Sequence, residues 1–135
     1  FDLLNVENSA SESTYAKFAW GIEEELIPHQ GKAFDVINET ASSLSINAKP
    51  TNIHTSDIFY RKDSNLPAVA EKYNCSAVEM EAFALFANAK HLGKNAATIL
   101  TVSDIIPTFE KISADERERA LKPMIELALE TAIKL

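Results

Sequence analysis

The sequence predicts an α/β domain with a mainly parallel or mixed central sheet flanked by helices. Two observations predict this fold class. Short apolar runs alternate along the chain with segments whose apolar residues recur at helical spacing, and strands that alternate with helices favour a sheet covered by helices. The length of 135 residues fits one domain, which at this size buries roughly two thirds of the extended-chain surface on folding.

Four apolar runs are the expected strands, and they cover residues 1–6, 48–58, 75–78 and 96–102. Pro50 should interrupt the second of them. The expected helices cover residues 32–44, 66–73, 79–92 and a last segment from residue 113. The Ser-rich residues 8–17 and the acidic residues 20–30 should form loops, and we find no internal repeat, low-complexity segment or linker.

Helix-end signals support these bounds. Pro67 stands near the start of the second helix, and Gly93 follows the third, as a residue beyond the last helical turn often does. Ser113 and Glu116 should form a capping box at the start of the last helix. Pro123 should bend or break that helix between Arg119 and Lys122. The apolar stripe of the last helix is expected at Leu121, Met124, Ile125, Ala128 and Ala132.

Composition excludes several classes of protein. The formal net charge of -7 opposes a surface that follows nucleic-acid phosphates. The single cysteine, Cys75, excludes an internal disulfide, and the three histidines lack other metal ligands at suitable spacing. No apolar run approaches the ~20 residues of a membrane helix, and no signal peptide is visible. We therefore expect a cytoplasmic protein that binds no metal, nucleic acid or membrane.

Carboxylates follow two of the expected strands. Glu81 should lie in the first turn of the helix after the strand at 75–78, and Asp104 should lie in a loop after the strand at 96–102. Open α/β sheets bind ligands beyond the carboxyl ends of their strands. The positive end of a helix dipole favours an ionised Glu81, which could then accept hydrogen bonds from hydroxyl groups.

Three blocks of sequence carry a resemblance to a known family. They are Thr55–Tyr60 (TSDIFY), Ala77–Ala82 (AVEMEA), and Thr101–Asp104 (TVSD) continued by Ala114–Arg117 (ADER). With these blocks the chain resembles the hexameric, bacterial-type purine nucleoside phosphorylases, from about residue 2 to residue 129. Their superfamily also includes uridine phosphorylase and methylthioadenosine nucleosidase. The resemblance implies a phosphorylase-type α/β/α fold.

The resemblance also implies a reaction. Such a glycosyltransferase cleaves the N-glycosidic bond of purine (deoxy)ribonucleosides with phosphate, as a step of purine salvage, and gives the free base and (deoxy)ribose 1-phosphate. Inorganic phosphate is a co-substrate, no further cofactor is needed, and the assembly is a homo-oligomer, a hexamer built as a trimer of dimers. Asp104 would protonate purine N7 as a general acid, and Arg117 would approach Asp104 to assist.

The remaining site residues would bind the nucleoside. By resemblance, Glu81 would accept the ribose 2′- and 3′-hydroxyls, Met80 would pack on the ribose, and Phe59 would lie against the purine. The substrate-binding set is completed by Val78, Glu79 and Ser103. Without the resemblance, Phe59 and Val78 would be interpreted as core residues, and Glu81 and Arg117 as solvated charges.

Other interpretations stay open. The three glycines are scattered and arginine is scarce, so we expect the phosphate-binding part to lie outside these residues and the chain to be the C-terminal part of a longer domain. A related nucleosidase, a uridine phosphorylase and a non-catalytic nucleoside-binding fragment are alternatives. Ile105 and Pro107 stand where family members often have histidine and arginine, so the choice between 6-oxopurines and 6-aminopurines is open.

Overall fold

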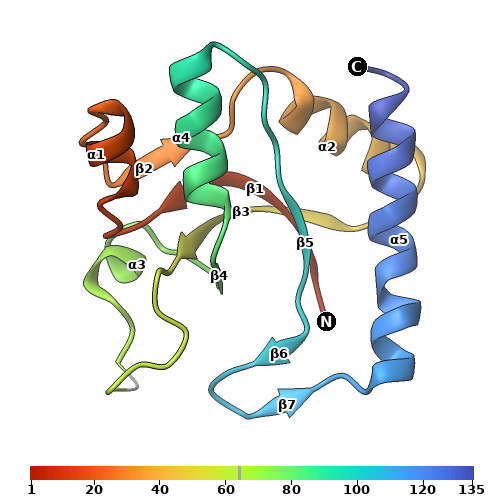
Figure 1. Cartoon of the computed structure of the whole chain (residues 1–135). Coiled ribbons are helices and arrows are strands. Elements are labelled where there is room, and N and C mark those ends of the chain that lie inside the picture. The colour runs from red at the N-terminus through yellow and green to blue at the C-terminus, as the bar shows by residue number, and fades with distance from the viewer. Residues whose placement is uncertain (64) are drawn as a thin grey trace.

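The computed structural model describes residues 1–63 and 65–135, and within them a five-stranded mixed sheet is surrounded by helices (Figure 1). The strands are β1 (Leu3–Ala10), β2 (Leu26–Pro28), β3 (Ala48–Thr55), β4 (Ala77–Glu79), β5 (Ile99–Thr101), β6 (Asp104–Ile105) and β7 (Glu110–Lys111). The helices are α1 (Tyr15–Trp20), α2 (Ala33–Ser43), α3 (Ala68–Lys72), α4 (Ala82–Leu92) and α5 (Ala114–Ala132).

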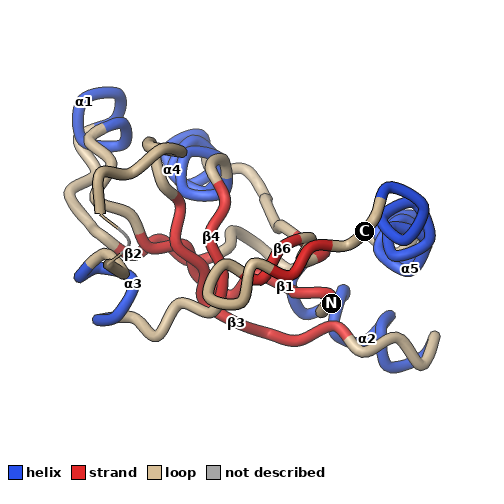
Figure 2. Tube along the Cα trace, turned by 90° about the horizontal axis from the view of Figure 1, so that it is seen from below, coloured by secondary structure: helices blue, strands red, loops and turns tan. Residues whose placement is uncertain are grey.

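Strand β1 organises the sheet. It pairs in parallel with β3, which pairs in parallel with β4. Its first residues pair antiparallel with β5 and its last residues antiparallel with β2. Figure 2 shows α1 and α4 on one face of this sheet and α2 on the other. Helix α5 lies at the side of the sheet and contacts α2 and β5. The predicted fold class, a mixed sheet flanked by helices, is confirmed.

The main core lies between the sheet and α4. Phe83 and Phe86 of α4 are buried against Val6 and Ile53, which belong to the two central strands. Burying a phenylalanine side chain contributes roughly 1.5–3 kcal/mol. This packing fixes α4 on the sheet and thereby fixes the place of its N-terminus, which follows β4 directly. A second cluster joins α2 to α5 through Ile37, Ala41 and Leu127.

The prediction of a loop over residues 8–17 is wrong, because most of these residues belong to β1 and α1. Strand β1 continues to Ala10, because Ser9 and Ala10 are buried and the Ser9 hydroxyl finds a partner on β3. Helix α1 then occupies Tyr15–Trp20 and ends at Gly21, whose φ of 68° is left-handed. The acidic segment over 20–30 contributes the short strand β2.

Pro50 does not interrupt β3. Within the part of the chain that the structure describes, β4 pairs only with residues 53–55 of β3, so one edge of β3 has no partner strand at Pro50 and accommodates a residue without an N–H. Asp104 was also expected in a loop, but it begins β6, which forms a two-stranded hairpin with β7. Helix α3 is shorter at both ends than expected, and α4 begins at Ala82 instead of Glu79.

Helix α5 has the predicted capping box of Ser113 and Glu116, but two other expectations for it are wrong. The helix runs unbroken through Pro123. Its buried residues are Leu127 and Thr131, whereas Ile125, Ala128 and Ala132 of the expected stripe are exposed. Leu127 packs against α2 and Ile99, and the Thr101 hydroxyl donates to the sulfur of Met124, so this face of α5 is turned toward the rest of the domain. None of the described helices is long and apolar enough to cross a membrane.

Replacing Pro123 by alanine should stabilise the chain. Alanine restores an N–H that can donate to the carbonyl of Arg119, and it removes the proline ring from that turn. Because alanine also gives the unfolded chain more freedom, we expect the free energy of unfolding to rise by about 1–3 kcal/mol in urea denaturation. The control is Pro107→Ala, in the exposed turn between β6 and β7. A Pro123→Ala chain no more stable than the control would contradict this account of α5.

Candidate functional site

The junction between β4 and α4 is held by the carboxylate of Glu79. One carboxylate oxygen, Oε2, accepts hydrogen bonds from the backbone N–H groups of Glu81 and Ala82, each at 2.7 Å. The other, Oε1, accepts a hydrogen bond from the hydroxyl of Thr55. Glu79 therefore supplies the acceptor and the negative charge that the N-terminus of α4 requires.

Thr55 connects this junction to the centre of the sheet. Its side chain is buried, and its Oγ1 accepts a hydrogen bond from the N–H of Phe83 at 3.1 Å. The same oxygen lies 2.7 Å from the hydroxyl oxygen of Ser9. Since Thr55 donates its proton to Glu79, Ser9 must donate to Thr55. This chain of hydrogen bonds links β1, β3, β4 and the first turn of α4.

Glu81 occupies the N-cap position of α4, not the first turn as expected. Its side chain is exposed, and its Oε2 accepts only the N–H of Met80, at 3.2 Å, among the bonds of the described residues. Most of its capacity as an acceptor is thus open to a ligand. Val78 is 46% exposed and Met80 is also exposed, so neither is a core residue in this structure.

The segment after β3 carries the aromatic residue of the predicted site. Phe59 is 74% exposed, and its ring meets the ring of Tyr60 edge to face at 5.0 Å. The hydroxyl of Ser56 donates to the carbonyl of Ile58 at 2.8 Å and begins the turn. Phe59 is therefore a surface aromatic residue rather than a core residue.

Glu12 contacts both β3 and the segment that follows it, and no pattern in the sequence predicted this role. The ring nitrogen Nε2 of buried His54 lies 2.8 Å from Oε2 of Glu12, and Arg61 lies 3.6 Å from Oε1. Partial burial favours the neutral form of Glu12, but the hydrogen bond with His54 and the nearby charge of Arg61 outweigh it, so the pKa of Glu12 lies below its ordinary value. A carboxylate thus connects the loop after β1 to the segment after β3.

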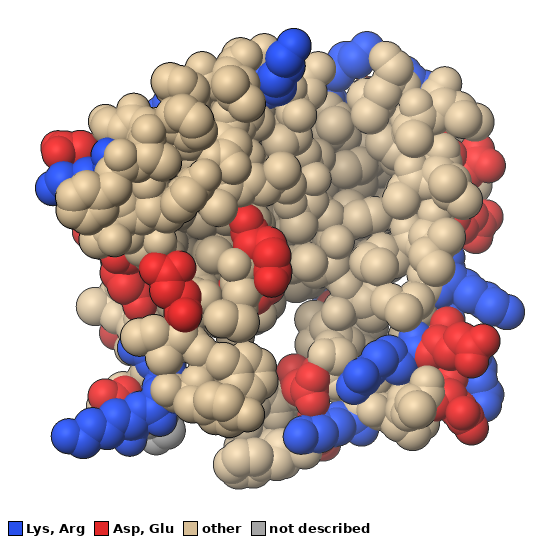
Figure 3. All heavy atoms as spheres, in the orientation of Figure 1, with Lys and Arg blue, Asp and Glu red and all other residues tan. Residues whose placement is uncertain are grey.

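Ser103 and Asp104 follow β5. The Ser103 hydroxyl donates to Oδ2 of Asp104 at 2.6 Å, and Asp104 is exposed. Figures 1 and 2 both place β6, which begins with Asp104, near the end of β4. Figure 3 shows a hollow on this face, with acidic side chains (red) along its rim. The short strand β6 therefore lies on the side of the fold where β4 ends.

Arg117 is not brought to Asp104. It lies in the first turns of α5 with an exposed side chain, and within the described residues it forms no ion pair within 4.0 Å of a carboxylate. In the same part of the chain, no group of three or more histidine, cysteine, aspartate or glutamate residues is placed to hold a metal ion.

Sequence comparison identifies the family. The family model described as "Phosphorylase superfamily" matches residues 25–134. The chain is 45% identical over 95 residues to the DeoD-type purine nucleoside phosphorylase of Colwellia psychrerythraea, covering 70% of this chain and 41% of that protein. It is 36% identical over 137 aligned positions to the DeoD-type enzyme of Mycoplasma genitalium, covering 99% of this chain and 57% of the relative. The chain thus spans about half the length of these relatives.

Solved structures show the same fold. The purine nucleoside phosphorylase of Toxoplasma gondii, in complex with immucillin-H, superposes with a TM-score of 0.79 at 15% identity, over 96% of this chain and 54% of that one. The Plasmodium knowlesi homologue of the P. falciparum enzyme gives 0.75 at 20% identity, over 96% and 52%. The family-model match over residues 25–134, which is most of the chain, shows that the chain belongs to the phosphorylase superfamily.

Proposed function

We propose that this chain forms the nucleoside-binding part of a purine nucleoside phosphorylase. The observation that carries the proposal is the exposed carboxylate of Glu81 just beyond β4, on a backbone that the bonds of Glu79 hold in place. The relatives at 36–45% identity are purine nucleoside phosphorylases, which favours this activity over those of other superfamily members.

The reaction defines what the site must do. An oxygen of phosphate forms a bond to C1′ of the ribose while the bond from C1′ to N9 breaks. The electron pair of that bond passes to the purine, which leaves poorly as an anion. A proton delivered to N7 neutralises it. General acid catalysis of this kind contributes roughly 10²- to 10⁴-fold in rate.

Asp104 is the proposed acid, with Ser103 beside it. In its neutral, protonated form it gives its proton to N7 and is left as a negatively charged carboxylate. Arg117 would stabilise that charge if it reached Asp104 in the nucleoside complex. Because α5 is unbroken, such an approach would move the start of the helix with the preceding segment instead of folding it at Pro123.

Glu81 would hold the sugar. Its free acceptor positions suit the 2′- and 3′-hydroxyls, and Met80 would pack on the ribose. Glu79 has both oxygens engaged in hydrogen bonds, so in this proposal it positions Glu81. Phe59 and Val78 would contact the purine ring, since exposed apolar side chains at a strand end favour a flat, apolar ligand.

The full reaction is tested in a polypeptide that combines this chain with the rest of a phosphorylase domain. Inosine and phosphate should give hypoxanthine and ribose 1-phosphate. Release of base without phosphate would indicate a nucleosidase, and turnover of uridine instead of inosine would indicate a uridine phosphorylase. From the resemblance we also propose a hexameric, cytoplasmic enzyme of purine salvage.

Glu81→Gln should weaken the binding of inosine to the chain by roughly 10- to 100-fold, because hydrogen bonds to a charged group contribute about 1.5–3 kcal/mol. The binding of 2′,3′-dideoxyinosine, which lacks both hydroxyls, should change little. Titration calorimetry with both ligands measures the difference. Glu126→Gln, which removes an exposed carboxylate on α5, is the matched control. If Glu81→Gln lowers the affinity for both ligands by the same factor, Glu81 does not bind the sugar hydroxyls.

Asp104→Asn should lower kcat for inosine by roughly 10²- to 10⁴-fold in the same combined polypeptide. The loss should be much smaller for 7-methylinosine, whose N7 already carries a methyl group and a positive charge and needs no proton. Steady-state kinetics on both nucleosides test the assignment. If both substrates lose the same factor, Asp104 is not the acid at N7.

A further inference from the structure

The Phe59 segment, residues 56–61, is exposed along most of its length and is held at its two ends. Phe59 itself presents most of its ring to solvent. At the first end Ser56 is buried, and its N–H donates to the carbonyl of Glu79 at 2.9 Å. The position of the Phe59 ring therefore depends on what holds Arg61 at the other end.

Arg61 is held by Glu12. A guanidinium nitrogen of Arg61 lies 3.6 Å from Oε1 of Glu12. Among the described residues, this ion pair is the only polar contact between residues 59–63 and another part of the chain. The Glu12 carboxylate is ionised at neutral pH and attracts the guanidinium charge. Loss of either charge should therefore release the second end of the Phe59 segment.

Glu12 is itself fixed on the sheet. Its Oε2 lies 2.8 Å from Nε2 of His54, which is 2% exposed. An ionised carboxylate only accepts hydrogen bonds, so Nε2 of His54 carries a proton and donates it. The preceding residue, Ser11, donates its hydroxyl to the carbonyl of Thr55 at 2.6 Å. One oxygen of Glu12 is thus bonded to β3, and the other is free to attract Arg61.

We propose that Glu12 is a positioning residue for purine binding: bonded to His54, it holds Arg61 and thereby keeps the Phe59 ring where the base binds. The proposal rests on the proposed function, in which Phe59 contacts the purine. A segment held in place before the ligand arrives loses less conformational entropy on binding, which raises affinity. The three blocks that carry the family resemblance include neither Glu12 nor His54 nor Arg61.

A purely structural role for Glu12 would be to give the buried His54 an acceptor. The two roles differ in what they require of Arg61. If Glu12 only serves His54, Arg61→Met leaves that hydrogen bond intact and should leave nucleoside binding unchanged. If Glu12 positions the Phe59 segment, Arg61→Met should weaken binding as much as Glu12→Gln does, because each change removes one charge of the same ion pair.

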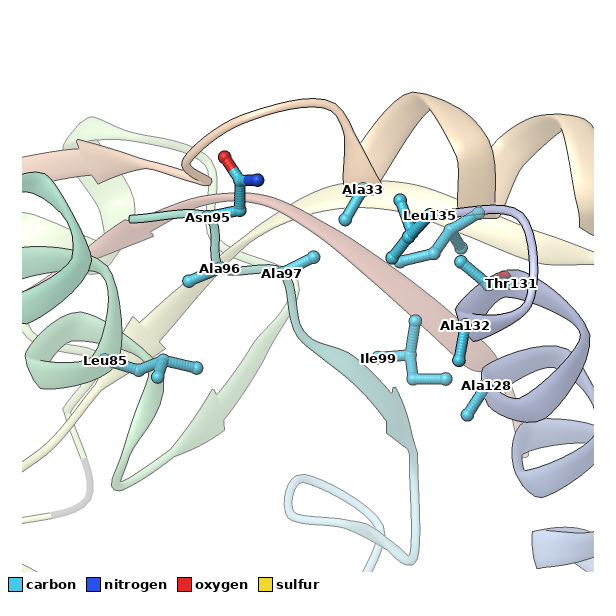
Figure 4. Close-up of a pocket in the computed structure, with 11 residues that line it drawn as sticks. Ala33, Leu85, Asn95, Ala96, Ala97, Ile99, Ala128, Thr131, Ala132 and Leu135 are labelled. Carbon is cyan, nitrogen blue, oxygen red and sulfur yellow. The ribbon is translucent and has the colours of Figure 1, made fainter. Parts of the chain in front are cut away.

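The apolar pocket between β5, α2 and α5 is a competing place for a purine base (Figure 4). Its volume of about 400 Å³ admits a small ligand. None of its lining residues is charged, however, so the pocket offers no carboxylate to the ribose hydroxyls. Ala128 is an exposed lining residue on α5. Ala128→Phe narrows the pocket and tests this alternative.

Backbone order parameters from nitrogen-15 relaxation measure the order of the Phe59 segment in the chain without ligand. In Glu12→Gln and in Arg61→Met the value at Phe59 should fall from about 0.85, typical of a rigid backbone, to below about 0.6. Glu24→Gln is the matched control, because the Glu24 side chain is 53% exposed against 52% for Glu12 but pairs with a lysine of α4. An unchanged order parameter in both test variants would overturn the proposal.

Titration calorimetry with inosine measures the effect on binding. Glu12→Gln and Arg61→Met should each raise the Kd of inosine by roughly two- to fivefold, the range of a partly exposed ion pair. The double variant should bind no more weakly than either single variant. In a Phe59→Ala background the same changes should have no further effect, because Glu12 acts through Phe59. Glu24→Gln and Ala128→Phe should bind inosine as the unaltered chain does.

Three outcomes of the calorimetry would overturn the proposal. They are an Arg61→Met chain that binds inosine as tightly as the unaltered chain, an undiminished effect of Glu12→Gln in the Phe59→Ala background, and a loss of binding in Ala128→Phe, which would place the base in the pocket. An unaltered chain that does not bind inosine would contradict the proposed function instead. The order parameters would then decide whether Glu12 holds the Phe59 segment.

Discussion

The hydrogen bond between Thr55 and Glu79 is the interaction on which the arrangement of the site depends. It joins the end of β3 to the end of β4, and the same Glu79 carboxylate accepts the first N–H groups of α4. A buried hydroxyl that lacks one of its partners costs about 1–3 kcal/mol. The Thr55 hydroxyl donates to Glu79 and accepts from the Phe83 N–H and the Ser9 hydroxyl. These three bonds hold β1, β3, β4 and α4 in place relative to one another.

Two neighbouring glutamates differ in what their carboxylates bind. Both carboxylate oxygens of Glu79 accept hydrogen bonds from other groups of the protein. The carboxylate of Glu81, two residues later, is exposed to solvent. A ligand-binding carboxylate needs a fixed backbone beneath it, since a side chain on a frayed helix end would lose affinity to disorder. Capping of α4 by Glu79 supplies that backbone, and the packing of Phe83 and Phe86 holds the helix on the sheet.

Local signals in the sequence predicted the elements whose ends they mark. Gly93 ends α4, and Ser113 with Glu116 caps α5 as expected. The errors arose where tertiary contacts decide. The serines after Val6 resemble a loop, but Ser9 pairs with Thr55 inside the sheet. Pro50 and Pro123 are tolerated because one edge of β3 is free and because α2 and β5 support α5.

In the candidate site, too, local sequence signals predicted some features and tertiary contacts determine the others. The blocks around Thr55, Glu81 and Asp104 could be found in the sequence because their order and spacing resemble those of the family. The bond from Thr55 to Glu79 and the contact of Glu12 with His54 could not, because they join residues far apart in the chain. The rotation of α5 was predicted wrongly because the helix is apolar over more than one face. Its outer face, with Ile133 and Leu129, has no partner within the described residues.

Amide exchange at Glu81 and Ala82 tests the central claim most directly, because these two N–H groups bond to Glu79. Thr55→Val keeps the shape of the side chain and removes the hydroxyl that holds Glu79. The matched control is Thr51→Val on the same strand, whose hydroxyl bonds instead to Ser76 near the surface. The account predicts that exchange at Glu81 and Ala82 becomes roughly tenfold faster or more in Thr55→Val, relative to Leu127 in the same chain. Equal exchange at these amides in the two variants, both as slow as in the unaltered chain, would contradict it.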